Sequence, residues 1–332
     1  MDFAEHGQMA SVKLICLTLT KGPDASRFGS RVCLAFDSWP QDGSKLRTLT
    51  TQGYKIVKLA NGVCSVHSVA HRETFHPVIG PVAEAEALYV KQLRLAERMA
   101  ARVEEFVIWD VGLGAAANVL TVLRATVGAK CPLRVMSFDH TLEPLRFARE
   151  NAGALGYFAG YEDTVATFLQ EQRVRFMDGN REVTWEFFPG DFPELISQSA
   201  KQLIAPHAIL FDAFSPAKNP AMWTQQVFAD IFRRLDPARP CSLATYSRST
   251  LLRVSLLLAG FYVGAGHATG EKEETTIAAN TPDLTEEPLD ASWLERARNS
   301  TSAEPLWEPV YRQARMAATT WEKLRRHPQF TA

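Results

Sequence analysis

Cysteine is scarce in this chain, and long apolar runs and an excess of one charge are missing. The five cysteines among 332 residues form no Cys-x-x-Cys pair, which predicts reduced core thiols rather than disulfides or a zinc site. The apolar stretch from Val12 to Thr20 is too short to span a bilayer and lacks the lead-in and cleavage site of a signal peptide. These absences favour a cytoplasmic protein without a membrane partner.

The charges of the chain are almost balanced, with 36 Lys and Arg against 37 Asp and Glu. No global basic field indicates a nucleic-acid partner, so any contact with RNA must depend on a local patch. Basic residues available for such a patch are Arg233, Arg234, Arg248, Arg253, Arg312, Arg315, Lys323, Arg325 and Arg326. The alternative for many of them is a solvated helix face.

From residue 106 onward, strand-like apolar runs alternate with helical ones. The alternation predicts an α/β, Rossmann-like fold with a seven-stranded, mostly parallel sheet and helices on both faces. The predicted strands are 106–111, 133–139, 183–188, 208–212, 242–246, 261–263 and 275–279. The predicted helices between them are 115–129, 142–154, 222–235 and 249–259.

Smaller units flank this domain. Asn61-Gly62 lies between two apolar runs and tolerates the positive φ angles of a hairpin turn, and residues 82–107 predict a helix that leads into the sheet. Scattered aromatic residues from Pro282 onward predict a helical tail. The chain is therefore divided into an extension of unassigned structure (1–50), a β-hairpin and helix (51–103), the main α/β domain (104–281) and a helical C-terminal extension (282–332).

The first motif with chemical content runs from Asp110 to Asn118, between a predicted strand and a predicted helix. Its Gly112 and Gly114 let a ligand approach the backbone closely. Asp139 ends the next strand, where Rossmann-type folds hold ribose hydroxyls. The simple alternative is a tight turn with a helix-capping acid.

This motif does not separate nucleoside cofactors from nicotinamide dinucleotides, because Ala117 provides the third small residue that the latter require. Gly190-Asp191-Phe192 follows another predicted strand, at the position where methyltransferases set an acid near the adenine. Alone, it is a common turn.

The most specific segment is Asp212-Ala-Phe-Ser-Pro-Ala-Lys-Asn-Pro-Ala-Met-Trp223, directly after the strand 208–212. It resembles the Asp-x-Phe-x-Pro-x-Lys-Asn-Pro-x-Met-Trp signature of the MnmC-like tRNA 5-methylaminomethyl-2-thiouridine methyltransferases. The resemblance covers roughly residues 60–280. It departs from the family at Ala116, where a glycine is usual, and the flavin-dependent oxidase half of bifunctional members is absent from this sequence.

The resemblance implies a class I methyltransferase domain at 104–281 that uses S-adenosyl-L-methionine to methylate the aminomethyl group of a tRNA wobble uridine. Asp212 is then the catalytic group that orients the amine or accepts its proton. The implied cofactor residues are Asp110, Gly112, Gly114, Asn118, Asp139, Asp191 and Phe192. The implied substrate residues are Phe214, Pro216, Lys218, Asn219, Trp223 and Lys272, with the tRNA anticodon loop as partner and a separate oxidase as a second partner to consider.

The segment from His76 to Pro81, with Glu84 and Tyr89, resembles the part of the family that helps close the active site. His67, His71 and His76 have no helical metal-ligand spacing, and surface or substrate-loop roles are favoured over a metal site. Two other functions remain open. One is a methyl or aminopropyl transferase for a small amine, and the other is a non-catalytic module that binds the cofactor or tRNA.

Overall fold

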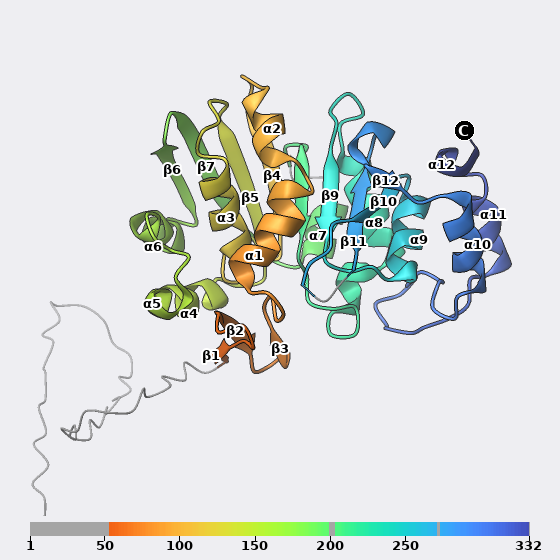
Figure 1. Cartoon of the computed structure of the whole chain (residues 1–332), viewed down its shortest axis with the longest axis horizontal. Coiled ribbons are helices and arrows are strands. Elements are labelled where there is room, and N and C mark those ends of the chain that lie inside the picture. Colours follow the sequence, from red (N-terminus) through yellow and green to blue (C-terminus); the bar gives the residue numbers. More distant parts are fainter. Residues whose placement is uncertain (1–52, 199–202, 271–272, 332) are drawn as a thin grey trace, which may run out of the picture. The chain divides into compact units, whose positions relative to one another are not determined.

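The computed structural model describes residues 53–198, 203–270 and 273–331, and the expected extension 1–50 and Lys272 lie outside them. Its centre is a nine-stranded sheet in the order β12-β10-β11-β9-β8-β4-β5-β7-β6 (Figure 1). The strands are β4 (Phe106–Val111), β5 (Leu133–Asp139), β6 (Arg173–Asp178), β7 (Arg181–Pro189), β8 (Ala208–Phe211), β9 (Ser242–Thr245), β10 (Tyr262–Gly266), β11 (Thr275–Ala279) and β12 (Glu287–Pro288).

The strand pairing confirms the predicted Rossmann-like class and corrects the strand count. Strands β7, β5, β4, β8 and β9 pair in parallel, and the other pairings of this sheet are antiparallel. All seven predicted strands are present, but the sheet has nine because β6 and β12 were missed. β6 is an edge strand with exposed Arg173 and Arg175, and β12 has only two residues, so neither presents a clear apolar period.

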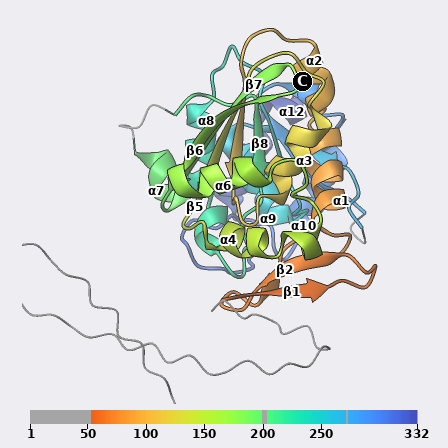
Figure 2. The ribbon, with the colours of Figure 1, turned by 90° about the vertical axis from the view of Figure 1, so that its left-hand side faces the viewer.

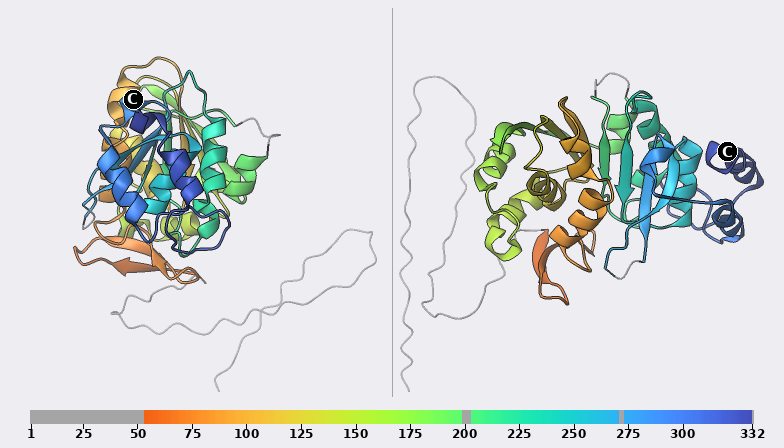
Figure 3. Two further views of the ribbon diagram at one scale, coloured as in Figure 1. Left: turned by 90° about the vertical axis from the view of Figure 1, so that its right-hand side faces the viewer. Right: turned by 45° about the horizontal axis from the view of Figure 1, so that its top comes forward.

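Two hydrophobic cores lie on opposite faces of the sheet, because successive strand side chains point to opposite sides. In β4, Phe106 and Ile108 enter one core, whereas Val107, Trp109 and Val111 enter the other. Helices α1 to α3 cover the first face and α7 and α8 the second (Figure 2). The C-terminal helices lie at the far end of the domain from α4 to α6 (Figure 3).

The helix predicted for residues 82–107 is interrupted. It consists of α1 (Pro81–Ala85), the π-helical η1 (Glu86–Lys91) and α2 (Leu95–Ala100), with Arg94 in the left-handed region at φ 51°. The interruption turns Gln92 inward, where its amide donates to the carbonyl of Thr276 at 3.2 Å and accepts from the His267 N–H at 2.7 Å. These bonds attach the helical segment to the sheet. The local apolar periodicity does not predict the interruption, because it depends on these tertiary contacts.

The other predicted helices are present with shifted ends, while α6 and α7 were not predicted and the tail is only partly helical. Residues 300–317 form no helix, since Pro305 and Pro309 remove backbone donors there. In the described part of the chain, no helix is both long enough and apolar enough to cross a membrane. The helices are α3 (Ala117–Ala125), α4 (Glu143–Glu150), α5 (Ala152–Leu155), α6 (Glu162–Glu171), α7 (Phe192–Ser197), η2 (Pro220–Trp223), α8 (Gln225–Arg234), α9 (Thr250–Ala259), η3 (Pro282–Leu284), α10 (Ala291–Asn299), α11 (Ala318–Leu324) and α12 (Pro328–Thr331).

A second, three-stranded sheet precedes the large one. It contains β1 (Tyr54–Lys58), β2 (Cys64–Ser68) and β3 (Glu73–Thr74), all antiparallel. The predicted hairpin is confirmed, with Gly62 at φ 86° in its turn. Figure 1 shows this small sheet below one end of the large sheet. That end carries the carboxyl termini of β4, β5 and β8, where ligands bind in open α/β sheets.

Candidate active site

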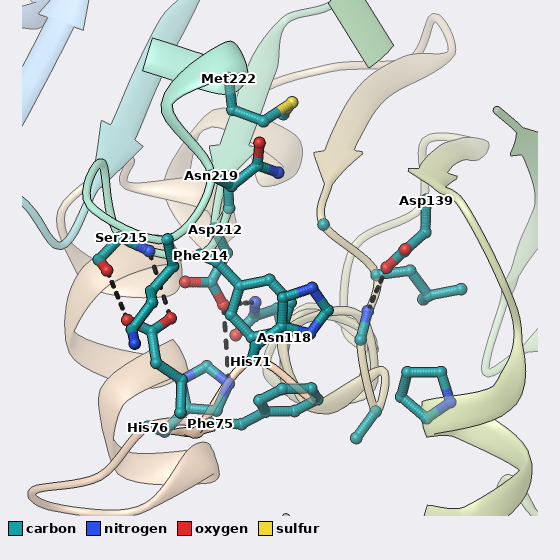
Figure 4. A pocket seen from close by; sticks show the side chains of 18 of the residues that line it. His71, Phe75, His76, Asn118, Asp139, Asp212, Phe214, Ser215, Asn219 and Met222 are labelled. Carbon is teal, nitrogen blue, oxygen red and sulfur yellow. Dashed lines mark hydrogen bonds and ion pairs between the residues drawn. The ribbon is translucent and has the colours of Figure 1, made fainter. Parts of the chain in front are cut away.

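A pocket of about 640 Å³ opens between the carboxyl ends of the parallel strands and the small sheet. Such a volume suits a small-molecule ligand. Asp139 from β5 and Asp212, which follows β8, both line the pocket, and Figure 4 shows them apart from each other. The pocket therefore joins the two regions that carried the strongest sequence motifs.

The glycine turn after β4 shapes the floor between these carboxylates. Gly112 has φ 95°, and a Cβ atom there would lie 2.6 Å from the backbone oxygen of Asp212. The N–H of Gly114 donates to Asp139 Oδ2 at 2.9 Å, and the N–H of His140 donates to Asp139 Oδ1 at 2.7 Å. Each Asp139 oxygen thus has one backbone donor and retains acceptor capacity for a ligand hydroxyl.

Two further polar side chains lie between the glycine turn and Asp212. Asp110 is buried and accepts from Ser137 Oγ at 2.7 Å. The pKa of Asp110 is raised to about 7: burial is the main cause, the Ser137 hydrogen bond opposes it, and the charges of Asp212 and Asp139 add to it. Asn118 Nδ2 donates to Asp212 Oδ2 at 2.7 Å, which fixes that carboxylate.

The loop after β8 is held from behind by two aromatic residues. Trp223 is buried, and its Nε1 donates to the carbonyl of Phe214 at 2.7 Å. The Tyr246 hydroxyl donates to the carbonyl of Ala213 at 3.0 Å. Burial, and secondly the charge of Asp212, raise the pKa of Tyr246 well above its ordinary value, so its hydroxyl keeps its proton.

The same loop is held from the front by β3 and the turn before it. Both Ser215 N and Ser215 Oγ donate to the carboxylate of Glu73. The His71 ring stacks on Phe214 with centroids 4.2 Å apart and an interplanar angle of 20°, and Phe75 lies 5.7 Å from Phe214. An aromatic platform therefore forms beside Asp212.

Most of the predicted site residues that the structure describes line this pocket. They are Gly112, Gly114, Asn118, Asp139, Phe192, Asp212, Phe214, Lys218 and Asn219. Asp110, Asp191 and Pro216 do not line it. Asp191 precedes α7 and lies 3.6 Å from His140 Nε2, although its neighbours Gly190 and Phe192 reach the pocket.

Trp223 requires a correction. It was expected among the substrate residues, but it is fully buried behind the loop and does not line the pocket. Its ring packs edge-on against Phe211 at 5.3 Å, so it supports the loop from the core. Both the apolar ring and the N–H group of Trp223 therefore make their contacts inside the protein.

Several pocket residues were not predicted, and most belong to the small sheet or to segments next to the strands. They are Tyr54, Glu73, Phe75, His140, Thr141 and Tyr246. Their separation along the chain explains why no single motif contains them. Of the segment from His76 to Pro81 with Glu84 and Tyr89, only His76, Pro77 and Glu84 line the pocket.

Within the described ranges, no group of three or more His, Cys, Asp or Glu side chains is arranged to hold a metal ion. His71 and His76 line the pocket, whereas His67 lies on β2 and contacts Thr74 Oγ1 at 2.8 Å. That the activity needs no metal stays a prediction.

Residues 159–281 match the model of a family described as S-adenosyl-L-methionine-dependent methyltransferase. A bifunctional protein of tRNA 5-methylaminomethyl-2-thiouridine biosynthesis, MnmC of Cupriavidus metallidurans, is 29% identical over 245 residues, which are 69% of this chain and 35% of the relative. The chain carries an MnmC-like methyltransferase domain. S-Adenosyl-L-methionine is the cofactor of such a domain.

Other similarities agree with this assignment. MnmC of Pseudomonas savastanoi pv. phaseolicola is 33% identical over 128 residues, covering 38% of this chain and 18% of the relative. The crystal structure of MnmC2 from Aquifex aeolicus aligns with a TM-score of 0.60 and 25% identity over 78% of this chain and 80% of that one. The chain spans about a third of the length of the first two curated relatives.

The pocket of the MnmC-like domain fits S-adenosyl-L-methionine in two respects. Asn118 lines the pocket, and its Oδ1 is a buried acceptor that lacks a hydrogen-bond partner within the described part of the chain. A ligand ammonium, such as that of the methionyl group, satisfies acceptors of this kind. Asp139 provides the acceptors that ribose hydroxyls require.

Proposed function

We propose that this domain converts the 5-aminomethyl group of a tRNA wobble uridine, 2-thiolated or not, to 5-methylaminomethyl. The main support is the loop from Asp212 to Trp223, which resembles the signature of the MnmC-like methyltransferases and lies beside a pocket of about 640 Å³. The relatives are named for 5-methylaminomethyl-2-thiouridine biosynthesis. The anticodon loop of tRNA is the proposed partner, and the cytoplasm, where tRNA is modified, is the proposed location.

The proposed unit comprises residues 104–281 together with the small sheet and helix of 51–103, which contribute one wall of the pocket. Residues 282–332 form a proposed C-terminal extension whose helices pack on the second core. A separate oxidase that prepares aminomethyl groups from larger precursors is compatible with this division.

On the cofactor side, we assign Asp139 to the ribose hydroxyls and Asn118 to the methionyl ammonium. Gly112 and Gly114 leave room for the ligand, and Phe192 offers an apolar contact for the adenine. Asp191, which does not line the pocket, retains at most a role through His140. When bound, the cofactor supplies a methyl group activated by its positively charged sulfur.

On the substrate side, Asp212 receives the aminomethyl group. An amine of this kind is protonated at neutral pH and has no lone pair for attack until it loses a proton. The carboxylate of Asp212, oriented by Asn118, attracts the ammonium and provides an acceptor for that proton. Its main contribution is the alignment of nitrogen with the methyl group.

The remaining substrate residues surround Asp212. Phe214, with its stacked partner His71, offers a flat face for the uracil ring. Lys218 is exposed at the pocket rim and suits an RNA phosphate, and Asn219 has an amide for the base edge. Pro216 shapes the loop between them.

A three-substrate assay tests the proposal. The protein is incubated with methyl-labelled S-adenosyl-L-methionine and either tRNA carrying 5-aminomethyluridine, the same tRNA without the modification, or putrescine. Label only in the modified tRNA supports the proposal. Label in putrescine favours a small-amine transferase, and cofactor binding without any transfer favours a non-catalytic module.

A further inference from the structure

One histidine lies between two carboxylates behind the proposed amine position. His76 Nε2 is 3.6 Å from Asp212 Oδ2, and His76 Nδ1 is 3.7 Å from Glu84 Oε1. The side chains of His76, Glu84 and Asp212 are 8%, 6% and 15% exposed, so the row is largely removed from water. Figure 4 shows the His76 ring beside Asp212 on the side of the pocket away from Asp139.

Three separate segments of the chain build this row. His76 follows β3 and adopts φ 49°, a left-handed conformation that a non-glycine residue takes only at some cost. Glu84 lies in the first turn of α1, which starts at Pro81 after Gly80 at φ 92°. Asp212 follows β8, the middle strand of the large sheet. The strained backbone at His76 is typical of a position that the surrounding structure holds for function.

We propose that His76, positioned by Glu84, takes the proton that Asp212 removes from the substrate ammonium. This proposal rests on the proposed function and adds two residues to it. An N–H bond of the ammonium breaks, its electron pair stays on nitrogen, and the proton passes to Asp212 and then to His76 Nε2. The nitrogen lone pair forms the N–C bond as the bond between the methyl group and the cofactor's sulfur breaks, and the electron pair of that bond stays on sulfur. Each turnover thus releases one proton, which His76 returns to solvent through the open pocket.

The relay solves a specific chemical problem. Asp212 alone is a poor proton acceptor for an aliphatic amine, since carboxylic acids have pKa values near 4 and such amines near about 10. An imidazole is a stronger base than a carboxylate, and histidine is the usual proton shuttle of proteins. The present separations are slightly longer than hydrogen bonds, and catalytic contacts of this kind commonly shorten when substrate binds.

The other titratable groups near these carboxylates are two phenols and two further carboxylic acids. Tyr246 and Tyr89 face the same carboxylates, and burial is the main reason that their pKa values lie well above the ordinary value. Both phenols therefore stay protonated. Glu73 is bonded to Ser215 in the loop, and Asp110 is bonded to Ser137 on the neighbouring strand.

The first test is the pH dependence of the His76→Gln variant. We expect kcat on aminomethyl-tRNA to fall about 100-fold near neutral pH, with KM for tRNA and the affinity for S-adenosylhomocysteine little changed. The deficit should shrink to about tenfold or less near pH 9, because more substrate then arrives deprotonated. His67→Gln, which changes a histidine of β2 that does not line the pocket, is the matched control.

Glu84→Gln tests the positioning role, with an expected loss of about tenfold and the same pH trend, since the amide holds the ring but carries no charge. A deficit in His76→Gln that is equal at all pH values, or absent, overturns the relay. If the wild type methylates no aminomethyl-tRNA, the proposed function fails instead. In that case ¹⁵N spectra of the His76 ring decide: the relay requires its chemical shifts to change in Asp212→Asn and Glu84→Gln, and unchanged shifts overturn it.

Discussion

Asp139→Ala should abolish most cofactor affinity while leaving the fold intact. Each Asp139 oxygen accepts one backbone N–H, from Gly114 or His140, and has capacity for one ribose hydroxyl. Hydrogen bonds to a charged group contribute about 1.5–3 kcal/mol each. With two such bonds that share one carboxylate, we expect a loss of about 3 kcal/mol in binding, which corresponds to a dissociation constant more than about 100-fold higher.

Calorimetric titration with S-adenosylhomocysteine measures this loss, and Asp163→Ala, which removes an exposed carboxylate on α6, is the control. A ligand change gives an independent check. The 2′,3′-dideoxy analogue should bind the wild type weakly and should lose little further affinity in Asp139→Ala, because the variant has already lost the partner of those hydroxyls. Equal binding of S-adenosylhomocysteine by the wild type and Asp139→Ala would refute the assignment.

Three further predictions concern stability. Burial is the main reason that the pKa of Asp110 is raised to about 7, so the protonated carboxyl stabilises the fold fully below about pH 4, and this stabilisation is lost as the pH rises through about 7. In urea unfolding, Asp110→Asn should therefore show a flatter dependence of the unfolding free energy on pH between these values. The same dependence in variant and wild type would contradict this. Trp223→Phe leaves the Phe214 carbonyl without its donor and should cost about 1–3 kcal/mol of unfolding free energy and raise KM for tRNA. Gly112→Ala should abolish cofactor binding and lower the melting temperature, because its Cβ would meet the Asp212 carbonyl at 2.6 Å; near-normal binding would show that the turn can move.

The parts of the fold and site that the sequence predicted well are those with local patterns. The strands of the parallel centre are continuous apolar runs, and the turn from Asp110 to Asn118 follows one of them directly. Because carboxyl ends of parallel strands meet at one edge, Asp139 and Asp212 line the same pocket. The sheet topology thus brings Asp139 and Asp212, which are 73 residues apart in the sequence, to one pocket.

The parts that were missed depend on tertiary contacts. β6 and β12 occupy sheet edges, where charged side chains hide the apolar period. The break at Arg94 and the inward turn of Gln92 follow from bonds to residues more than 170 positions away. Likewise, the contact of Glu73 with Ser215 and the stacking of His71 on Phe214 join the small sheet to a distant loop, and no local pattern encodes either.

Ala116 stands where the resembling family usually has glycine, and the structure shows the backbone conformation at this position. It adopts φ 60° at the start of α3, a conformation that glycine takes without strain and that costs an L-residue about 1–2 kcal/mol. Its methyl group is buried, which offsets part of this cost. The position therefore tolerates alanine without a different turn.

The central claim is that the domain places an aminomethyl nitrogen of tRNA against Asp212 for methyl transfer. The most direct measurement is the single-turnover rate of 5-methylaminomethyluridine formation in tRNA, by nucleoside mass spectrometry, for the wild type and for Asp212→Asn with saturating S-adenosyl-L-methionine. The account predicts product with the wild type and a rate at least about 100-fold lower in the variant, with cofactor affinity retained. Equal rates for the two proteins, or no product with the wild type despite bound cofactor, would contradict it.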